Sequence, residues 1–466
     1  MSLKSLKDTI VAIATPPGRG GVGIIRISGP EATLKSISLE LLENTSKNPR
    51  QFSFEPRQTY FRRVVDSLNR VIDEGLVIYF AAPSSFTGEH ILEFQGHGGP
   101  VVMDAVLQRA VQLGARLARP GEFSERAFLN DKIDLVQAEA IADLIDSSSQ
   151  QAARCAVRSL QGVFSKKIHA LNELLILLRT YTEASIDFPE EEVDFLSNSQ
   201  VAIQLTELMD QLALIRNEAC QGSVINEGIN VVISGPPNAG KSSLLNYLSG
   251  LDSAIVTDIP GTTRDLLREK IVIDGLPVNI IDTAGLRESD EVVEQEGIKR
   301  AKVALEQADQ IIFVSDGSED NDTGDDQRLK LLQELAIDNI PMIWVNNKLD
   351  LMAQQKPSLC VEKKFSKICL SVKTGQGIEL LTEQIKKLAG FNEVGEGSYT
   401  ARRRHLDALD RVSENLQDAQ MQLQSGAGEL MAEELRLAQQ ALGEITGEFS
   451  SDDLLGSIFS SFCIGK

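Results

Sequence analysis

Short apolar runs separated by turn residues dominate the first 120 residues of the chain. Such runs are typical of β-strands, and they predict strands at Thr9–Ala14, Gly23–Ile27, Gly75–Phe80 and Ile91–Gln95. One longer stretch, Val101–Leu113, has the apolar spacing of a helix. We therefore expect an α/β domain over residues 1–120.

From about residue 122 onward the apolar positions follow a helical period instead. This pattern predicts helices at Lys132–Ser147, Gln150–Ser159 and Lys166–Ala184, and no strand is expected among them. Residues 229–390 then alternate strand and helix, which is typical of a mostly parallel sheet.

A Gly-rich, polar linker at Asn392–Ser398 precedes two further helical stretches, Ala401–Leu423 and Glu429–Leu442, and a short tail. The helical stretches on either side of the βα block each contain too few helices to bury their own apolar stripes. The simplest packing joins them into one helical domain with the βα block inserted, because chain ends of a domain commonly lie close together. The predicted domains are 1–120, 121–222 with 391–466, and an inserted 223–390, giving a multidomain α/β plus all-α protein.

Composition narrows the class of protein. The 466 residues are 42% hydrophobic and 24% charged, which is ordinary for a globular protein. No apolar run approaches the roughly 20 residues that span a bilayer, and no secretory leader is expected. Five cysteines are scattered without a CxxC pair, which argues against a disulfide framework or a zinc site and favours the cytoplasm. They are Cys155, Cys220, Cys360, Cys369 and Cys463.

Acidic residues are unevenly distributed. The chain carries a net charge of -21, yet residues 1–120 hold 14 Lys and Arg against 11 Asp and Glu. Broad nucleic-acid binding is driven by Lys and Arg that displace counterions, so the acidic majority argues against it. Specific contact through the mildly basic N-terminal part remains open.

A phosphate-binding loop is predicted at Gly235–Ser242, which reads GPPNAGKS and fits GxxxxGK[ST]. An apolar strand, Ile229–Ile233, precedes it, and a helix, Lys241–Leu248, follows. In such a loop, backbone N–H groups hold the phosphates, Lys241 reaches the outer phosphate oxygens, and the Ser242 hydroxyl ligates Mg²⁺. The alternative is a strand-to-helix turn that binds nothing.

Three later motifs indicate that the nucleotide is GTP. Asp282–Gly285 (DTAG) closes an apolar strand and is expected near Mg²⁺ and the γ-phosphate. In Asn347–Asp350 (NKLD), the Asp350 carboxylate can accept from the guanine ring N–H and exocyclic amine, which adenine cannot reproduce. Ser371–Lys373 (SVK) would supply a backbone N–H to the guanine oxygen. Taken alone, Asp350 would be an ordinary loop acid.

A switch segment is expected between the phosphate loop and DTAG, at Asp258–Asp265. Either Thr262 or Thr263 could supply a second hydroxyl to Mg²⁺. After DTAG stands Leu286, where many GTPases have the Gln that orients the attacking water. Another group must therefore do so, and composition does not choose among the carboxylates that follow: Glu288, Asp290, Glu291, Glu294 and Glu296.

Over essentially its full length, the chain resembles the MnmE (TrmE) family of bacterial and organellar tRNA-modification GTPases. The resemblance rests on seven segments: TPPGRGGVGIIRISGP (15–30), SSFTGEHILEFQGHGGP (84–100), RPGEFSERAFLNDKIDLVQAEAIADLID (119–146), GPPNAGKSSLLN (235–246), TDIPGTTRD (257–265), DTAGLRE (282–288) and FCIGK (462–466).

The resemblance implies three parts: an N-terminal folate-binding domain similar to aminomethyltransferases, a helical domain, and a Ras-like domain inserted in it. It also implies a homodimer joined through the N-terminal domains. With the flavoprotein MnmG, the family places an aminomethyl or carboxymethylaminomethyl group on carbon 5 of the wobble uridine of certain tRNAs. The one-carbon unit comes from a 5-formyl- or 5,10-methylene-tetrahydrofolate, whereas FAD belongs to the partner.

The resemblance further implies roles for individual residues. Glu294 matches the water-activating carboxylate, and Asn238, Lys241 and Thr262 share the catalytic site with it. K⁺ would be held by Asn238, Thr257, Ile259 and Thr262, and Mg²⁺ by Ser242 and Thr263. The folate contacts match Arg26, Glu93, Lys132 and Lys466. The full GTP site would comprise Asn238, Ala239, Gly240, Lys241, Ser242, Ser243, Thr257, Asp258, Ile259, Pro260, Gly261, Thr262, Thr263, Asp282, Thr283, Ala284, Gly285, Asn347, Lys348, Asp350, Ser371, Val372 and Lys373.

Some alternatives stay open on the residues alone. Glu93 could hold a pterin bidentately and Arg or Lys could meet a glutamate tail, but a surface ion pair is the default interpretation. Cys463 invites a nucleophile interpretation, although a Cys in an apolar tail is more often a packed small residue. For the whole protein, the competing hypotheses are a regulatory GTPase that binds ribosomes or RNA without folate, and a scaffold that needs no nucleotide.

Overall fold

The computed structural model describes residues 8–43, 54–187, 199–251, 268–282, 308–318, 340–352, 356–361, 365–391, 398–449 and 452–465. The chain forms two compact units. Unit 1 comprises Met1–Ala142, Ile168–Ala184 and Gly428–Lys466, and unit 2 comprises Asp143–Lys167 and Ser185–Ala427. Both units take residues from the helical stretches, and the predicted domain boundaries stay a prediction.

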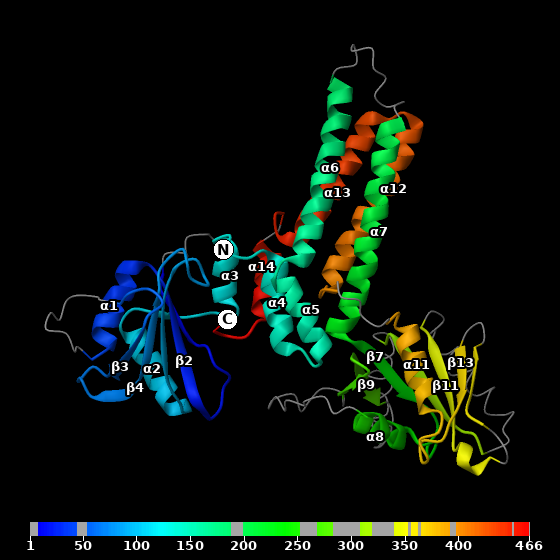
Figure 1. The fold of residues 1–466 in the computed structure, drawn as a ribbon, viewed down its shortest axis with the longest axis horizontal. Coiled ribbons are helices and arrows are strands. Elements are labelled where there is room, and N and C mark those ends of the chain that lie inside the picture. Colours follow the sequence, from blue (N-terminus) through cyan, green and yellow to red (C-terminus); the bar gives the residue numbers. More distant parts are fainter. Residues whose placement is uncertain are drawn as a thin grey trace, which may run out of the picture. The chain divides into compact units, whose positions relative to one another are not determined.

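Unit 1 contains a six-stranded sheet in the order β3-β4-β5-β2-β1-β6, antiparallel except for the β1–β6 pair (Figure 1). The strands are β1 (Ile10–Ile13), β2 (Gly20–Gly29), β3 (Thr59–Val65), β4 (Val71–Phe80), β5 (His90–Gly98) and β6 (Arg116–Leu117). The helices that lie within it are α1 (Glu31–Leu41), α2 (Pro100–Gln112), α3 (Glu122–Leu129), α13 (Gly428–Thr446) and α14 (Asp452–Ser460). Helices α4 (Leu135–Asp146) and α6 (Val163–Asp187) contain residues of both units.

The two faces of the unit 1 sheet are covered differently. On one face, Val77 and Phe94 of the strands pack with Leu34 of α1 and Val106 of α2 in a buried core. Side chains of a strand alternate between faces, so the neighbours of these core residues point the other way. There a smaller cluster forms, in which Ile10 of β1 packs with Phe123 of α3 and with Phe86.

Unit 2 contains a seven-stranded sheet in the order β12-β13-β11-β10-β7-β9-β8, parallel except at its two edge strands. The strands are β7 (Ile229–Ser234), β8 (Arg268–Ile273), β9 (Leu276–Asp282), β10 (Gln310–Asp316), β11 (Met342–Asn347), β12 (Ser358–Val361) and β13 (Phe365–Cys369). The helices within it are α5 (Gln150–Leu160), α7 (Ser199–Glu227), α8 (Lys241–Leu251), η3 (Leu349–Leu351), α11 (Ile378–Leu388) and α12 (Arg403–Ser425). The predicted mostly parallel sheet is confirmed.

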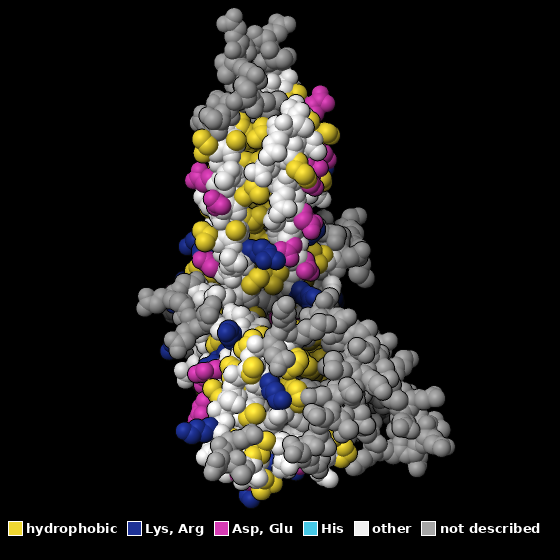
Figure 2. All heavy atoms as spheres, turned by 90° about the vertical axis from the view of Figure 1, so that its right-hand side faces the viewer, with side chains coloured by type: hydrophobic (Ala, Val, Ile, Leu, Met, Phe, Trp, Pro, Cys, Tyr) yellow, Lys and Arg dark blue, Asp and Glu magenta, His cyan; other side chains and the backbone are white. Residues whose placement is uncertain are grey.

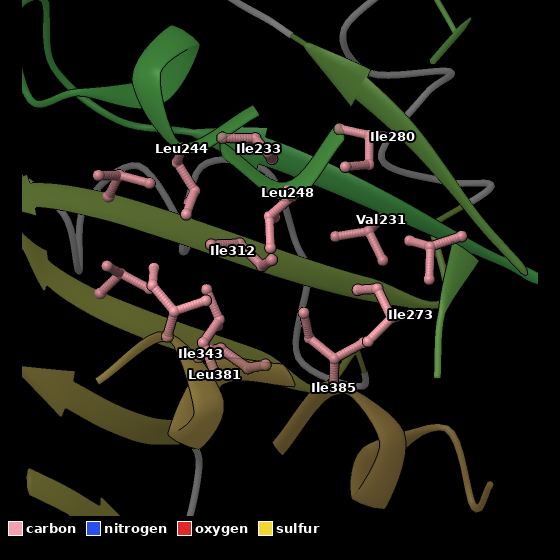
Figure 3. Close-up of a cluster of buried hydrophobic side chains, with 14 of the residues drawn as sticks. Val231, Ile233, Leu244, Leu248, Ile273, Ile280, Ile312, Ile343, Leu381 and Ile385 are labelled. Atoms are coloured by element: carbon pink, nitrogen blue, oxygen red, sulfur yellow. The ribbon is translucent and has the colours of Figure 1, made fainter. Parts of the chain in front are cut away.

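Helices α8 and α11 cover one face of the unit 2 sheet. Figure 3 shows Leu244 and Leu248 of α8, with Leu381 of α11, converging on branched side chains such as Ile233 and Ile312 of the central strands. All five are at most 1% exposed. A parallel sheet needs cover of this kind because its strands are apolar on both faces.

Long helices form the rest of the described structure. On the face drawn in Figure 2, hydrophobic side chains lie among polar ones along these helices. Exposed apolar residues include Ile203 and Leu214 of α7 and Met421 of α12. No helix among the described residues has both the length and the apolar character needed to cross a bilayer.

Several elements differ from the sequence-based expectation. The structure adds α1 to the single helix expected in the first 120 residues, adds α7 between the predicted helices and the βα block, and turns the short tail into α14. In α1, buried Ser38 lies beside Ile37 in the stripe, which weakens the apolar pattern. In α7, exposed apolar residues such as Ile203 and Leu214 dilute the stripe of buried ones, so helical periodicity gives little signal.

Candidate functional site

The turn between β7 and α8 has the conformation of a phosphate-binding loop. Gly235 and Gly240 have φ of 147° and 100°, and a Cβ at these positions would lie 2.1 Å from the Val314 oxygen and 2.2 Å from Asn347 Nδ2. Both positions therefore require glycine. Asn238 also has positive φ, at 63°, which Asn tolerates better than most residues. The glycines let the backbone approach closely where a phosphate would be held.

Lys241 begins α8 and folds its side chain back over this loop. Its Nζ donates to the carbonyl oxygens of Gly235 and Pro236, at 3.0 and 2.8 Å. The ammonium group is thus held above the turn that the sequence assigns to the phosphates. Ser242 and Ser243 follow it in the first turn of the helix, and both are exposed.

Asn347 joins the phosphate loop to the predicted guanine loops. It is 4% exposed, its Nδ2 donates to the Ala239 carbonyl at 2.9 Å, and its Oδ1 accepts from the Val372 backbone N–H at 3.1 Å. One buried amide therefore holds together loops that follow β7, β11 and β13. These loops meet because the carboxyl ends of parallel strands lie at one edge of a sheet.

The residues predicted to bind guanine lie next to one another in this arrangement. Ser371 is fully buried, and its Oγ donates to Asp350 Oδ1 at 2.6 Å. Lys348 has a φ of 67° and pairs with Asp316. Burial opposes ionisation of Asp316, but the hydrogen bonds from Lys348 and Ser318 outweigh it and lower the pKa of Asp316.

Much of the predicted catalytic apparatus lies outside the described residues. Asp282 is described only as the end of β9, and its side chain is not described. The predicted switch residues, most of the DTAG motif with the residue after it, the candidate water-activating carboxylates and the terminal lysine are not described at all. These are Thr257, Asp258, Ile259, Pro260, Gly261, Thr262, Thr263, Thr283, Ala284, Gly285, Leu286, Glu288, Asp290, Glu291, Glu294, Glu296 and Lys466.

In unit 1, Arg26 and Glu93 form the ion pair that the sequence allowed as an alternative. They lie directly opposite each other on β2 and β5, with Arg26 Nε 2.8 Å from Glu93 Oε1. The Arg26 guanidinium also lies 5.7 Å from the ring centroids of Phe86 and Phe123, and it donates to the Gly465 carbonyl at 3.3 Å. Because the pair is mostly buried and its guanidinium lies near two aromatic rings, it differs from a surface ion pair.

The other two candidate residues that the structure describes in unit 1 are Lys132 and Cys463. Lys132 lies beside Gly88: a Cβ on Gly88 would stand 3.2 Å from Lys132 Cγ. Cys463 is exposed, which argues against its interpretation as a packed small residue. Its carbonyl accepts from the Gly121 backbone N–H at 3.4 Å, so the C-terminal segment contacts the turn before α3.

Sequence reasoning missed a buried charge network beneath the same face. Arg126 and Glu122 are both 2% exposed and bond to each other at 3.2 Å. Arg126 also bonds to Asp8 and Glu89, and Arg116 bonds to Asp8 and Glu122. Burial opposes ionisation of Glu122, yet the hydrogen bonds from Arg116 and Arg119 lower its pKa. The segment RPGEFSERAF carried the signal, because charged residues recur there among apolar ones.

Two family models together match most of the chain. The family model described as the GTP-binding protein TrmE N-terminus matches residues 9–132, and the MnmE helical domain model matches residues 135–463. The chain is 53% identical to a tRNA modification GTPase MnmE of Stutzerimonas stutzeri over 461 residues, which cover 99% of each chain. It is 54% identical to one from Vibrio cholerae, covering 98% of this chain and 99% of that protein.

Among solved structures, the G domain of the T. maritima FeoB iron transporter is 26% identical. The match covers 34% of this chain and 98% of that one, with a TM-score of 0.26. A score this low supports no conclusion about function.

Proposed function

Because this chain belongs to the MnmE family of tRNA modification GTPases, we propose that it binds and hydrolyses GTP to drive a tRNA modification. The observation that carries the proposal is the buried Asn347 amide, which holds the phosphate loop against the guanine loops. Sites for the two ends of one nucleotide are thereby kept in a fixed relation. A strand-to-helix turn that binds nothing has no need of this link.

In the proposed site, each described residue has a defined task. Lys241 exchanges its carbonyl contacts for the outer phosphate oxygens, and Ser242 supplies a hydroxyl to Mg²⁺. Asp350 accepts from the guanine ring N–H and amine, and its contact with Ser371 fixes the carboxylate. Backbone amides complete the site at both ends of the nucleotide. Those of Ala239 and Gly240 would donate to the phosphates, and those of Val372 and Lys373 to the guanine.

The metal ligands and the activating group are proposed from the family. Asn238, Thr257, Ile259 and Thr262 would bind K⁺, which supplies positive charge beside the transferred phosphoryl group. Thr263 would join Ser242 on Mg²⁺, and Glu294 would activate water in place of the missing Gln. Of these residues, Asn238 and Ser242 are described, and Asn238 lies within the phosphate loop with a φ of 63°.

In unit 1 we infer a tetrahydrofolate site. The Glu93 carboxylate suits the amine and ring N–H of a pterin, and Arg26, Lys132 and Lys466 provide positive charge for the rest of a reduced folate. The two aromatic rings near Arg26 and the C-terminal segment give this pair an apolar, partly enclosed setting. The folate would supply the one-carbon unit of the modification.

The proposed reaction also needs partners. The protein would act as a homodimer with the flavoprotein MnmG, which brings FAD and reducing equivalents. The product would be a 5-aminomethyl or 5-carboxymethylaminomethyl group on uridine 34 of certain tRNAs. We place this work in the cytoplasm.

The K⁺ proposal is tested by hydrolysis rates in KCl and in NaCl. Asn238→Gly removes the amide ligand while keeping a residue that adopts positive φ without strain. We expect wild type to hydrolyse GTP faster in KCl, and the variant to lose that preference. Asn246→Ala, on the exposed side of α8, is the matched control. Equal wild-type rates in the two salts would exclude the K⁺ role.

The folate site separates the proposed function from a regulatory RNA-binding switch. Calorimetry of the full-length protein with 5-formyl-tetrahydrofolate should detect binding in wild type. A pure switch has no use for such a site. Absence of binding by wild type, with GTP binding intact, would favour the switch.

A further inference from the structure

A histidine–aspartate pair lies in unit 1 outside the sites described so far. His97, near the end of β5, bonds through Nδ1 to Asp73 Oδ1 at 2.7 Å. Its backbone N–H donates to the other carboxylate oxygen of Asp73 at 2.8 Å. One carboxylate thus holds both the ring and the backbone of the same residue, which fixes the imidazole and places the proton on Nδ1 whenever the ring is neutral.

In this pair the histidine is exposed to solvent and the aspartate is buried. The Asp73 side chain is 8% exposed and that of His97 is 72% exposed. A Cβ at Gly96 would stand 2.3 Å from Asp73 Oδ2, so the glycine before His97 makes room for the carboxylate. Among the described residues, none is recorded as bonding to Nε2 of His97, which leaves that lone pair open to solvent.

A second histidine–carboxylate pair shows what an ordinary surface contact looks like here. His169 of α6 lies 3.5 Å from Glu448, and both side chains are 44% exposed. Neither partner is buried, and the contact is long. By comparison, the His97–Asp73 pair has the arrangement of an oriented acid–base group, in which a buried carboxylate aligns an accessible imidazole.

The charges around His97 favour proton uptake. The hydrogen bond to Asp73 and its negative charge raise the pKa of His97, and Glu74 adds to the effect. Burial opposes ionisation of Asp73, but the hydrogen bonds from His97 lower its pKa. Arg63, on β3 beyond β4, is paired with Glu74. On the other side, β2 begins with Gly20 opposite Gly98, and exposed Arg19 precedes it.

His97 also shares a sheet face with the proposed folate pair. Glu93 and His97 are four positions apart on β5, so the Cα–Cβ bonds of both leave the strand on the face opposite Leu92 and Phe94. Four residues of strand span about 13 Å. This spacing is shorter than an extended reduced folate, so a folate held at Glu93 is long enough to extend to His97.

We propose that His97, oriented by Asp73, is a general base that takes a proton from the amine substrate of the modification. This inference rests on the proposed folate-dependent function. An amine is mostly ammonium at neutral pH and has no lone pair until it loses a proton. In the step, an N–H bond of the ammonium breaks and an Nε2–H bond forms on His97. Nothing is oxidised or reduced, and the exposed ring then releases the proton to water.

The test is a reconstituted modification assay with full-length protein, the flavoprotein partner, a folate and unmodified tRNA. Ammonium chloride and glycine serve as the amines in separate arms. His97→Gln is the key variant, because a Gln amide can still donate to Asp73 but cannot take up a proton at neutral pH. We expect a loss of about 10²-fold or more in modification rate. GTP hydrolysis should be unchanged, and His169→Gln should behave as wild type.

Two readouts separate proton transfer from a structural role. The rate with His97→Ala should rise when free imidazole is added, and it should lose the acid limb of the wild-type pH profile. Independently of activity, NMR of ¹³C-labelled histidines should show a titration of His97 that moves to lower pH in Asp73→Asn. Its resonance should also shift when 5-formyl-tetrahydrofolate binds.

The possible outcomes are distinct. If wild type itself modifies no tRNA, the proposed function fails and this inference with it. If wild type is active but His97→Gln retains its rate and pH profile, or imidazole does not restore His97→Ala, the inference alone is overturned. A His97 chemical shift that does not change when folate binds would also contradict the inference.

Discussion

The two sheets of this protein present their polar groups in different ways. In unit 2 the parallel strands end at one edge, and the nucleotide residues follow those ends in short contiguous motifs. In unit 1 the strands are mostly antiparallel, and the polar pairs form across them. Arg26 and Glu93 are 67 residues apart in the sequence, and Asp73 and His97 are 24 apart. Parallel strand ends therefore give sites that a motif reveals, whereas cross-strand pairs become visible only in the folded sheet.

The largest effect is expected from the charge network that supports unit 1. Arg126→Met would leave the carboxylates of Glu122 and Glu89 without their buried partner. Removing one member of a buried ion pair costs about 3–5 kcal/mol, and we expect that loss in the free energy of unfolding of unit 1.

Chemical denaturation would measure this loss. The matched control is Arg70→Met. It removes an ion pair with Asp66 in which Arg70 is 75% exposed, so it should cost far less stability than Arg126→Met. Equal losses in the two variants would show that the buried network adds no stability beyond a surface pair.

The second prediction concerns the nucleotide site alone. Lys241→Ala removes the ammonium group from the phosphate loop, and we expect GTP binding to weaken by about 2–5 kcal/mol. Folate binding should not change, since the residues proposed to bind folate lie in unit 1. Lys270→Ala, on the exposed part of β8, is the control. Nucleotide titration by fluorescence would decide, and an affinity within threefold of wild type would contradict the site assignment.

The converse substitution, Glu93→Gln, tests the proposed folate site in unit 1 while leaving the nucleotide site unchanged. It removes the negative charge that faces Arg26 and would face a pterin. A hydrogen bond to a charged group contributes about 1.5–3 kcal/mol, so 5-formyl-tetrahydrofolate should bind about 10- to 100-fold more weakly. GTP hydrolysis should stay at the wild-type rate. Calorimetry would show the change, and Glu40→Gln, at an exposed position of α1, should leave the affinity as it was.

The smallest effect is a difference in acid sensitivity. Burial opposes ionisation of Glu122 and Asp8, but hydrogen bonds from the arginines lower both pKa values below the ordinary 4.5 and 3.8. A carboxyl with a depressed folded pKa stabilises the fold above its unfolded pKa and loses that contribution as the pH falls through the folded value.

Unit 1 should therefore lose stability below about pH 4.5, and Arg126→Met should flatten that dependence. Denaturation at a series of pH values from 7 to about 3 would measure it. An unchanged pH slope in Arg126→Met would show that the arginine does not hold these pKa values down.

The sequence predicted those elements whose conformation depends on residues close together in the chain. The strands near Ile91–Gln95 and the turn at Gly235–Ser242 follow from apolar spacing and from the glycines that the turn requires, and both are confirmed. The long helix α7 was missed because exposed apolar residues, such as Ile203 and Leu214, dilute its buried stripe. The Asp73–His97 pair was missed because the sequence does not reveal that a carboxylate enters the space beside Gly96.

The central claim is that two separate sites, one on each sheet, are both required for one tRNA modification. It is tested most directly by mass spectrometry of tRNA nucleosides from cells that lack this protein. Such cells would be complemented with wild type, Lys241→Ala or Glu93→Gln. We predict that only wild type restores the 5-aminomethyl-type uridines, although Glu93→Gln still hydrolyses GTP. Full restoration by Glu93→Gln, or an unchanged nucleoside profile in cells without the protein, would contradict the claim.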